Sequence, residues 1–570
     1  MLKTRDSISA ALLTATKRLA DAGELNLAFP PEIAEVERPR IQEHGDWSSN
    51  LALTLAKQAK RSPREIAELI AGAIEVPGGI REVAVEGAGF VNFHLDPEAW
   101  GEVVREVVES GSDFGSCSIG AGTVTNLEFV SANPTGPMHL GHARWAAWGD
   151  ALGRLLSKSG FTLTREFYIN DAGNQLELLG KSLAARYLHA LGQEAEVPED
   201  GYQGDYLVDL AAELVAEVGD SWAAIDAGER DEKCGEWGCA RLTREIKDQL
   251  GRLGVEFDVW FSERAMRESG AVERALDDLR ELDKVYEAEG ATWLRSTDFG
   301  DDKDRVLVKS DGSYTYLAGD IAYHRDKFAR GFELLIDLWG ADHGGHVPKL
   351  RAAIEALGYP VDSLEVVLGQ LVSLERGGEP VRMSKRSGDV YTYEELVDEI
   401  GPDAARFHFL MQGPDSALRL DLDAIVAQSM ENPVFYVQMA HARICSIQRK
   451  AAEAGIDREA IDEVDLGLLV ANEELSLLRK LDEYPDLIAD AAQRRAPHRL
   501  TQWARELAGA FHSFYQEHRV IDGPGQMVQA RLWLIEACRI GLADAMGLLG
   551  VHAPELMERI DADDSIEGES

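Results

Sequence analysis

The sequence predicts a multidomain protein with an α+β N-terminal domain, a central α/β domain on a parallel sheet, and an all-helical C-terminal domain. Three observations lead to this fold class. A chain of 570 residues is too long for a single hydrophobic core. From Thr123 the apolar pattern alternates between strand, helix and strand, which is typical of parallel sheets. After residue 406 almost all apolar residues follow helical spacing.

The first 115 residues combine helical and strand patterns. Helical apolar spacing runs through SISAALLTATKRLADAG and through SSNLALTLAKQAKRSPREIAELIAGAI. The segment REVAVEGAGFVNFHL alternates apolar and polar residues on both sides of a glycine turn, which predicts two strands. The Gly- and Ser-rich stretch from Glu109 to Gly122 predicts a linker. We therefore expect the N-terminal domain at residues 1–115.

The central domain is expected at residues 116–405. It begins with the strand TVTNLEFV, the helix ARWAAWGDALGRLLSKSG and the strand FTLTREFYIN, which predict a right-handed parallel unit. A charged helical segment near 180–295 interrupts this pattern and is expected to be an insertion. Strands return at RVLVKS, FELLIDLWG and LEVVLGQLV, and the helical domain is expected at residues 406–570.

The composition limits the partners of the chain. Its 100 acidic residues outnumber 58 Lys and Arg, which gives a net charge of −42. A nucleic-acid partner would therefore need a local basic surface. The five cysteines form no CxxC pair, so neither a disulfide framework nor a zinc site is expected. We find no secretory leader and no membrane-spanning run, and we expect a cytoplasmic protein without membrane contact.

Two histidines occur where a predicted strand passes into a helix, in EFVSANPTGPMHLGHARWAAWGD. His139 and His142 are spaced i, i+3 and lie on one side of the first helical turn. A helix N-terminus attracts anions, and parallel sheets bind ligands at the carboxyl ends of their strands. Gly141 leaves room for a flat base to approach the backbone. The pair therefore suits a nucleotide, with helix capping and packing as the alternative.

A second motif, EPVRMSKRSGDV, places Arg382, Lys385 and Arg386 in a polar loop after a predicted strand. Cations beside two serines suit the binding of a pyrophosphate, although a basic turn by itself is usually a solvated loop. The order of the two motifs, with a parallel sheet between them, makes nucleotide binding the favoured interpretation.

HLGH and MSKR resemble the two signature motifs of the class I aminoacyl-tRNA synthetases. The segments SANPTGPMHLGHAR, YINDAGNQ, RMSKRSGD, ENPVFYVQMAHAR and LLGVHAPELM resemble the arginyl-tRNA synthetase family in particular. The resemblance begins at HGDWSSNLAL and therefore covers nearly the whole chain. It implies a Rossmann-like catalytic domain with a helical insertion, between an N-terminal tRNA-binding domain and a helical anticodon-binding domain.

The resemblance implies a ligase that activates L-arginine with ATP and transfers it from arginyl-adenylate to the 3′-terminal adenosine of tRNA(Arg). It also implies that activation needs bound tRNA, that Mg²⁺ bridges the phosphates with few protein ligands, and that the chain acts as a monomer. The catalytic residues would be His139, His142 and Lys385, which neutralise phosphate charge. The ATP-binding residues would be His139, Gly141, His142, Met383, Ser384, Lys385 and Arg386.

A pocket that selects arginine needs acceptors for a planar guanidinium with five donors, and carboxylates are the strongest. Tyr316 and Asp320 are spaced i, i+4 on one predicted helix face. We expect Asp320 to bind the guanidinium with Tyr316 beside it, whereas an ordinary solvated helix carboxylate is the alternative. The family's arginine-binding positions correspond to Glu128, Asn133, Tyr316 and Asp320, and the segment WGADHGGH adds Asp342 and His343 at another strand end.

Binding of tRNA requires basic and aromatic side chains on the same surface. The C-terminal helices mix the two kinds in QRRAPHRLTQWAR and FHSFYQEHRVID, and splayed anticodon bases stack on aromatic rings. Single aromatics in helices are more often part of the core, which is the alternative for each of them. The expected tRNA-binding residues, of which the first two would contact the tRNA elbow, are Phe90, Asn92, Tyr436, His441 and Arg443.

Two other functions compete with this interpretation. Another class I synthetase, or a ligase that acts on a small molecule, could use the same ATP motifs. A small-molecule ligase would not need the long helical region after the MSKR loop. A non-catalytic tRNA-binding relative would be expected to lose the HxGH motif or Lys385, and this sequence keeps both.

Overall fold

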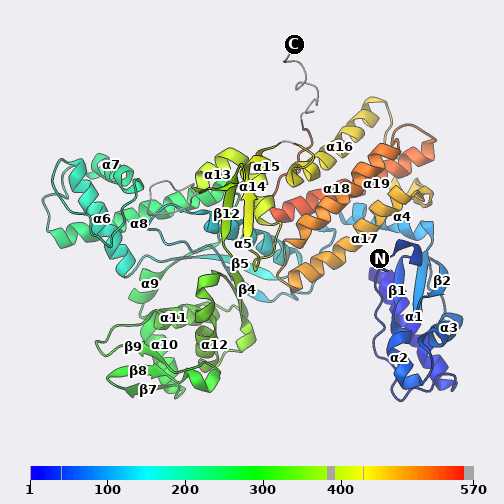
Figure 1. Cartoon of the computed structure of the whole chain (residues 1–570), viewed down its shortest axis with the longest axis horizontal. Coiled ribbons are helices and arrows are strands. Elements are labelled where there is room, and N and C mark those ends of the chain that lie inside the picture. The colour runs from blue at the N-terminus through cyan, green and yellow to red at the C-terminus, as the bar shows by residue number, and fades with distance from the viewer. Residues whose placement is uncertain (1, 40, 382–391, 428, 558–570) are drawn as a thin grey trace, which may run out of the picture.

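The computed structural model describes residues 2–39, 41–381, 392–427 and 429–557. It confirms the predicted fold class, because an α+β domain, a parallel-sheet domain and a helical bundle follow one another along the chain (Figure 1). Within this part of the chain, no helix is long and apolar enough to cross a membrane.

The N-terminal domain packs helices against a three-stranded antiparallel sheet in the order β1-β3-β2. The predicted glycine turn connects β2 and β3, and both Gly87 (φ 56°) and Gly89 (φ 129°) adopt backbone angles that favour glycine. The elements are α1 (Leu2–Asp21), β1 (Trp47–Ser49), α2 (Leu51–Ala59), α3 (Pro63–Ala73), β2 (Ile80–Glu86) and β3 (Phe90–Leu95).

The helix α4 (Pro97–Ser110) follows this domain and packs against the C-terminal helices α17 and α19. Its buried face includes Trp100, Val103 and Val107. The stretch that follows, within the predicted linker, leads directly to the first strand of the central sheet.

The central domain is built on a five-stranded, wholly parallel sheet in the order β11-β10-β4-β5-β6. The helix α5 is buried along nearly its whole length between this sheet and the C-terminal bundle. The elements of the sheet and its flanking helices are β4 (Val124–Glu128), α5 (Leu140–Lys158), β5 (Thr162–Ile169), β6 (Val259–Ser262), α11 (Tyr316–Ala329), β10 (Leu334–Gly340), α12 (Val347–Ala356) and β11 (Leu364–Gly369).

The expected helical insertion near 180–295 contains strands as well as helices. Three helices form an arm with a hydrophobic core of its own, on the left of Figure 1: α6 (Asn174–Ala190), α7 (Tyr206–Val218) and α8 (Ala227–Arg252). The strand β6 pairs with β5 and forms the edge of the main sheet. All four of its residues are half-buried, so buried and exposed residues do not alternate along it.

A second, smaller lobe lies after β6. It holds an antiparallel sheet in the order β7-β8-β9, so the predicted strand at RVLVKS belongs to this sheet and not to the parallel one. Its elements are α9 (Glu263–Glu268), α10 (Ala271–Glu281), β7 (Val285–Ala288), β8 (Ala291–Leu294) and β9 (Arg305–Val308).

The C-terminal part begins with a small sheet in the order β13-β12-β14 and continues as a helical bundle. The expected domain boundary at residue 406 falls inside α14, which packs against both α5 and α16. The elements are β12 (Val372–Arg376), β13 (Glu379–Pro380), α13 (Tyr393–Ile400), α14 (Pro402–Phe409), β14 (Leu418–Asp421), α15 (Leu422–Val426), α16 (Pro433–Glu453), α17 (Asn472–Gln493), α18 (Arg499–Glu517) and α19 (Gly525–Leu549).

Candidate active site

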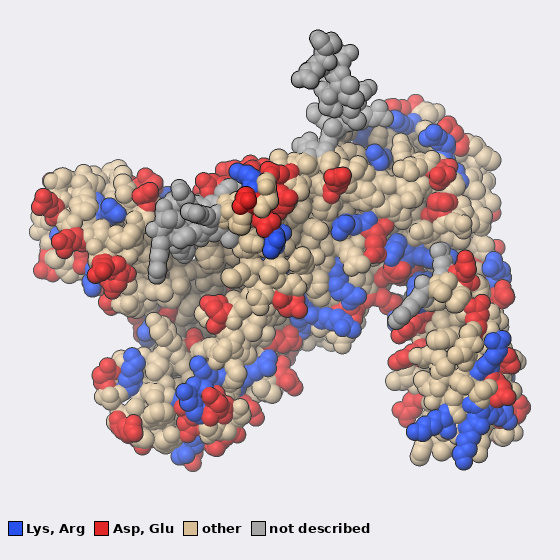
Figure 2. Space-filling view, in the orientation of Figure 1, with Lys and Arg blue, Asp and Glu red and all other residues tan. Residues whose placement is uncertain are grey.

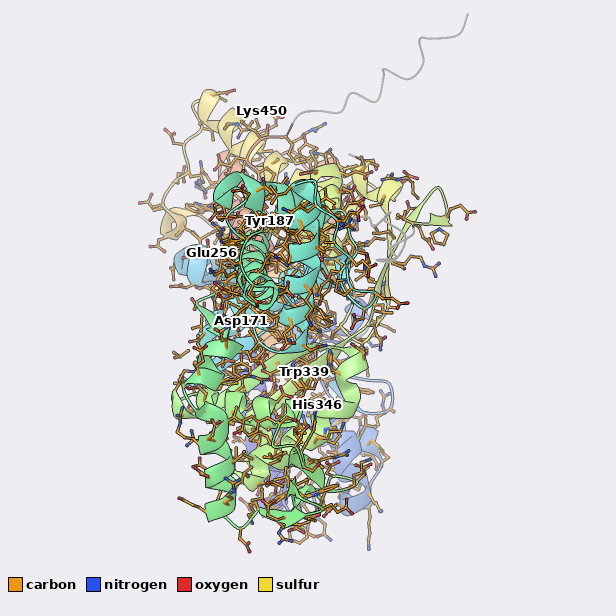
Figure 3. All side chains as sticks on the ribbon, turned by 90° about the vertical axis from the view of Figure 1, so that its left-hand side faces the viewer. Asp171, Tyr187, Glu256, Trp339, His346 and Lys450 are labelled. Atoms are coloured by element: carbon orange, nitrogen blue, oxygen red, sulfur yellow. The ribbon has the colours of Figure 1, made fainter. Side chains whose placement is uncertain are left out.

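The carboxyl ends of the parallel strands define one edge of the central sheet. Along the chain, β5 and β6 extend the sheet on one side of β4, whereas β10 and β11 extend it on the other. The crevice between β4 and β10 is therefore the topological switch point, where parallel sheets bind ligands. In the view of Figure 3, Asp171, after β5, lies above Trp339 of β10 and His346 of the 3-10 helix that follows β10.

The histidine pair lies at the N-terminus of α5, the helix that follows β4 along the chain. The rings of His139 and His142 stack with centroids 3.6 Å apart and planes 18° from parallel. The backbone N–H of His139, the N-cap residue, faces His142 Nδ1 at 3.4 Å. Both rings are half-buried, so each has an edge that a ligand can reach. The spacing seen in the sequence therefore produces a single imidazole surface at a helix N-terminus.

Gly141 is required by the packing of this pair. A Cβ atom built on Gly141 would lie 3.0 Å from Cε1 and 3.1 Å from Nδ1 of the His139 ring. Any side chain here would press against the imidazole and displace it. The glycine thus leaves space for the His139 ring in the first turn.

Acidic groups surround the strand next to β4. Tyr168, in β5, lies within electrostatic range of the carboxylates of Glu263, Asp320 and Glu128, and of these Glu263 acts on it most strongly. Burial and these negative charges raise the pKa of Tyr168 well above its ordinary value. A neutral phenol surrounded by carboxylates provides an environment that favours a bound cation.

Glu128, the last residue of β4, is buried, and both of its carboxylate oxygens accept hydrogen bonds. Its Oε2 accepts from Lys327 Nζ at 2.6 Å and its Oε1 accepts from Ser131 Oγ at 3.0 Å. Burial raises the pKa of Glu128 despite the attraction of Lys327, and the neighbouring Asp337 carboxylate adds to this effect. The hydrogen bonds from Lys327 and Ser131 therefore hold the carboxylate in one orientation.

Asp320 lies in the second turn of α11 and faces the segment after β10. Its Oδ2 lies 2.8 Å from Nε2 of His346. The side chain of Asp320 is 39% exposed and that of His346 is 25% exposed, so both remain within reach of a ligand. The His346 ring also lies 5.8 Å from the Trp339 ring, measured between centroids.

The remaining predicted arginine-site residues are more exposed. Tyr316, the first residue of α11, is 77% exposed. Asp342 and His343 lie in the short 3-10 helix after β10 and are both exposed, with 3.5 Å between the carboxylate and Nε2. Asn133 is exposed, and its side-chain oxygen lies 3.3 Å from the side-chain amide of Asn170. Glu128 and Asp320 thus lie within electrostatic range of Tyr168, whereas Tyr316, Asp342 and His343 are exposed.

The second predicted motif lies outside the described residues. Its residues are Arg382, Met383, Ser384, Lys385 and Arg386. Among the residues that the structure does describe, no group of three or more His, Cys, Asp or Glu side chains could hold a metal ion.

Phe90 and Asn92 lie together in the N-terminal domain. They line a cavity of about 470 Å³ whose wall also includes Arg38 and His44. Phe90 is 40% exposed, whereas Asn92 is buried and accepts a hydrogen bond from Ser48 Oγ at 2.6 Å. The Phe90 ring is thus accessible to a ligand, whereas the side-chain amide of Asn92 is held by its hydrogen bond.

Tyr436 and Arg443 meet around His512 in the helical bundle. Arg443 donates from Nη1 to His512 Nδ1 at 3.0 Å, and His512 Nε2 faces the Tyr436 carbonyl oxygen at 3.2 Å. His441 is different, because it is buried and its Nδ1 faces the Pro554 carbonyl oxygen at 2.9 Å. The structure therefore places His441 under the C-terminal segment and away from solvent.

The sequence reasoning did not assign roles to Tyr168 or Lys327. Tyr168 is the first residue of the family-like segment YINDAGNQ, which was a usable signal. Lys327 follows Asp320 by seven residues and so lies on the same helix face. An aspartate, Asp337, inside the apolar run LLIDLW indicated that a buried cation would be needed opposite it.

Comparisons with known proteins cover each part of the chain. Residues 3–95 match a family model described as the arginyl tRNA synthetase N terminal domain. Residues 116–446 match the catalytic domain of class I (R) tRNA synthetases. Residues 437–557 match the DALR anticodon binding domain.

Similar full-length proteins carry one description. The arginine–tRNA ligase of Moorella thermoacetica is 48% identical over 97% of this chain and 99% of its own length. The arginine–tRNA ligase of Geobacillus thermodenitrificans is 48% identical over 94% of this chain and 97% of its own.

Solved structures give the same result. The structure described as a putative arginyl-tRNA synthetase from Campylobacter jejuni is 36% identical, covers 81% of this chain and all of its own, and has a TM-score of 0.74. The fold also matches arginyl-tRNA synthetase from Thermus thermophilus, at 23% identity and a TM-score of 0.75, over 97% of this chain and all of the Thermus chain.

Proposed function

The chain belongs to the arginyl-tRNA synthetase family, and from this premise we propose which of its side chains perform each part of the reaction. It is an arginine–tRNA ligase of class I that activates L-arginine with ATP and transfers it from arginyl-adenylate to the 3′-terminal adenosine of tRNA(Arg). The observation that supports our assignments most strongly is the stacked histidine pair at the N-terminus of α5, the helix that follows β4 at the switch point of the parallel sheet.

His139 and His142 bind the phosphates of ATP in this proposal, and the adenine ring approaches the backbone at Gly141. The arginine carboxylate oxygen attacks the α-phosphorus, the bond to the bridging oxygen breaks, and pyrophosphate leaves. Negative charge builds on the phosphate oxygens in the transition state, where the imidazoles stabilise it. The loop residues Met383, Ser384, Lys385 and Arg386, which lie outside the described residues, would bind the departing pyrophosphate.

Asp320 and Glu128 are the proposed acceptors for the guanidinium of arginine. Two carboxylates whose charges both act on Tyr168 suit a planar group with five donors. Asn133 would bind the α-ammonium or carboxylate end, and Tyr316 would cover the side chain. Asp342 and His343 complete the proposed set at the exposed rim of the crevice.

Transfer follows in the same crevice. A ribose hydroxyl of the terminal adenosine, the 2′-hydroxyl in class I enzymes, attacks the carbonyl carbon of arginyl-adenylate and AMP leaves. The Mg²⁺ that accompanies ATP would be held mainly by its phosphates, because the described side chains around the crevice form no cluster of metal ligands. We propose a monomer as the working unit.

Contact with tRNA is proposed at two surfaces. At the N-terminal domain, the accessible Phe90 ring would stack on a base of the tRNA elbow, above the fixed amide of Asn92. At the helical bundle, Tyr436 and Arg443 would contact the anticodon loop. His441 would act there by supporting the segment at Pro554, because its own ring is buried.

Charging assays test the function directly. Purified full-length protein is incubated with ATP, total tRNA and each of the twenty amino acids in turn, and only arginine is expected to be esterified. ATP–pyrophosphate exchange is measured with and without tRNA, and exchange is expected only when tRNA is present. Charging of another amino acid at a comparable rate would refute the proposed specificity.

The arginine pocket has its own test. Asp320→Asn removes the charge that would pair with the guanidinium, so KM for arginine should rise roughly 10- to 100-fold, as for loss of a charged hydrogen bond. KM for ATP should change little. The matched control is Asp326→Asn, in the same helix, whose carboxylate pairs with Arg330 at 2.9 Å. Equal effects of the two variants would contradict the role of Asp320.

A further inference from the structure

A buried chain of hydrogen bonds runs from the carboxylate of Glu128 to the backbone of Asp320, the other proposed guanidinium acceptor. Glu128 Oε2 accepts from Lys327 Nζ at 2.6 Å, and Lys327 Nζ also donates to Asp337 Oδ1 at 2.9 Å. The other oxygen of Asp337 lies 2.8 Å from His324 Nε2. His324 Nδ1 in turn lies 2.7 Å from the backbone carbonyl oxygen of Asp320.

Lys327 is the centre of this chain and cannot reach a ligand itself. The side chains of Lys327 and Asp337 are fully buried, and Glu128 is only 9% exposed. The third side of the ammonium faces the Tyr323 ring, 4.3 Å from its centroid. A buried cation of this kind is stable only when all of its partners are in place. Its role must therefore act through its neighbours.

The strand register explains why a cation is needed at this point. Glu128 of β4 and Asp337 of β10 are direct partners across neighbouring parallel strands. Without Lys327 the two carboxylates would repel each other in a buried environment. One of them would then take up a proton or turn away. Burial alone would lower the pKa of Lys327, but the two carboxylates raise it above its ordinary value, so the ammonium stays charged.

The second oxygen of Glu128 is fixed from the opposite side. Ser131 Oγ donates to Glu128 Oε1 at 3.0 Å and accepts from the Tyr168 backbone N–H at 3.1 Å. The tight turn that places Ser131 is strained, because Val130 (φ 67°) and Ser131 (φ 39°) both adopt left-handed backbone angles. A β-branched residue in this conformation persists only when its surroundings require it.

We propose that Lys327 is a positioning residue for arginine selection, which holds the Glu128 carboxylate charged and oriented toward the guanidinium. The inference rests on the proposed function, since it assumes that Glu128 binds arginine. It goes further by assigning the selectivity of the pocket to an ion pair that the substrate never touches. A neutral or displaced Glu128 would accept poorly from a guanidinium and would tolerate citrulline, whose urea group is uncharged.

Lys327→Met removes the ammonium while keeping most of the side-chain volume. In ATP–pyrophosphate exchange with tRNA present, KM for arginine should rise roughly tenfold or more, as expected for coupled charged neighbours. KM for ATP should stay within about twofold, and the preference for arginine over citrulline should decrease. Lys327→Arg, which restores a positive charge, should recover part of the lost affinity.

A matched control separates positioning from general packing. Lys158 pairs with Asp544 at 2.7 Å and its side chain is only 8% exposed, but it lies at the far end of α5. Lys158→Met should lower stability without changing KM for arginine. If Lys327→Met and Lys158→Met change KM for arginine and KM for ATP equally, the positioning role is wrong.

A double-mutant cycle with Glu128→Gln completes the test. If Lys327 acts through Glu128, Lys327→Met should have little further effect on KM for arginine once Glu128 is already neutral. Full additivity would overturn the inference while leaving the role of Glu128 intact. If Glu128→Gln alone leaves KM unchanged, the assignment of Glu128 in the proposed function fails instead. Should Lys327→Met not fold, Asp337→Asn weakens the same chain and is expected to raise KM for arginine selectively; an unchanged KM would again overturn the inference.

Discussion

At the scale of single residues, the first turn of α5 concentrates the proposed phosphate chemistry. A spacing of three residues places the imidazoles of His139 and His142 face to face, and the helix N-terminus adds partial positive charge. Because α5 is buried along nearly its whole length, this turn is fixed before any ligand arrives. Rigid placement of a charge-stabilising donor is what raises the rate of a step in which charge develops.

The first prediction concerns His142. His142→Ala should lower the ATP–pyrophosphate exchange rate by about 10²–10³, as for loss of one positioned donor. His189→Ala, which removes an exposed histidine on the arm, should leave the rate unchanged. The rates are measured with both substrates saturating, and an unchanged rate for His142→Ala would refute its role.

At the scale of elements, one arginine joins three segments around the active-site helix. Arg406, in α14, donates to the Leu549 carbonyl at 2.9 Å, to the Leu253 carbonyl at 2.9 Å and to Asp150 of α5. Arg406 is 1% exposed. The helix that carries the histidine pair is thus tied to the arm and to the end of the last helix by a single buried side chain.

The second prediction follows from this connection. Arg406→Met should destabilise the protein by about 3 kcal/mol, at the lower end for a broken buried ion pair, because Arg154 still pairs with Asp150 at 2.7 Å. The unfolding midpoint is measured by thermal denaturation. Arg154→Met, whose side chain is 38% exposed, should lower the midpoint much less. Equal midpoints for the two variants would contradict the proposed importance of Arg406.

The helical bundle contains a second kind of buried polar group. Burial, together with the positive charge of Arg443, lowers the pKa of His512 to about 4. Its hydrogen bonds require the same neutral form, since Nδ1 accepts from Arg443 and Nε2 faces a carbonyl. The unfolded chain has an ordinary histidine pKa of about 6.5. As the pH falls below this value, the unfolded chain therefore binds a proton that the folded bundle excludes.

The third prediction is a loss of stability in acid. Between pH 6.5 and 4, His512 should contribute a loss of up to about 1.4 kcal/mol per pH unit, and above pH 6.5 it should contribute none. His512→Gln should reduce the decrease in unfolding midpoint between pH 7 and pH 5. His552→Gln, at a side chain that is 84% exposed, serves as the control. An unchanged pH profile for His512→Gln would show that His512 is not neutral in the folded state.

At the scale of the whole molecule, an acidic protein has to bind an anionic partner. Figure 2 shows acidic side chains over much of the visible surface and a gathering of Lys and Arg on the N-terminal domain. Exposed basic residues there, from the end of α2 to the start of α3, are Lys57, Lys60, Arg61 and Arg64. A local basic surface of this kind would attract tRNA while the net charge repels other nucleic acids.

The fourth prediction is a steep dependence of tRNA binding on salt. Each phosphate neutralised by a basic side chain contributes about −0.7 to −0.9 to the slope of log K against log salt concentration. The double variant Lys60→Ala with Arg61→Ala removes two cations. It should therefore reduce the magnitude of this slope by up to about twice the contribution of one phosphate. Binding is followed by filter retention or fluorescence across a range of salt concentrations. Affinity that does not depend on salt would contradict electrostatic recognition.

Features set by local spacing were predictable from the sequence. The histidine pair, the β2–β3 turn at Gly87 and Gly89, and the unit β4–α5–β5 all depend on residues close together in the chain. The strand β6 was not predictable, because its four half-buried residues give no periodic signal. The burial of His441 under Pro554 was equally hidden, since the two residues are far apart in sequence.

The sequence by itself determined the fold class and the family and predicted the two nucleotide motifs, because each rests on the order and spacing of residues along the chain. Only the tertiary structure decided which charged side chains share one environment. Lys327 and Glu128 are 199 positions apart in the chain, and Lys327 Nζ lies 2.6 Å from the carboxylate of Glu128. The physical reason is that burial and ion pairing are created by packing between strands and helices, which no local pattern records.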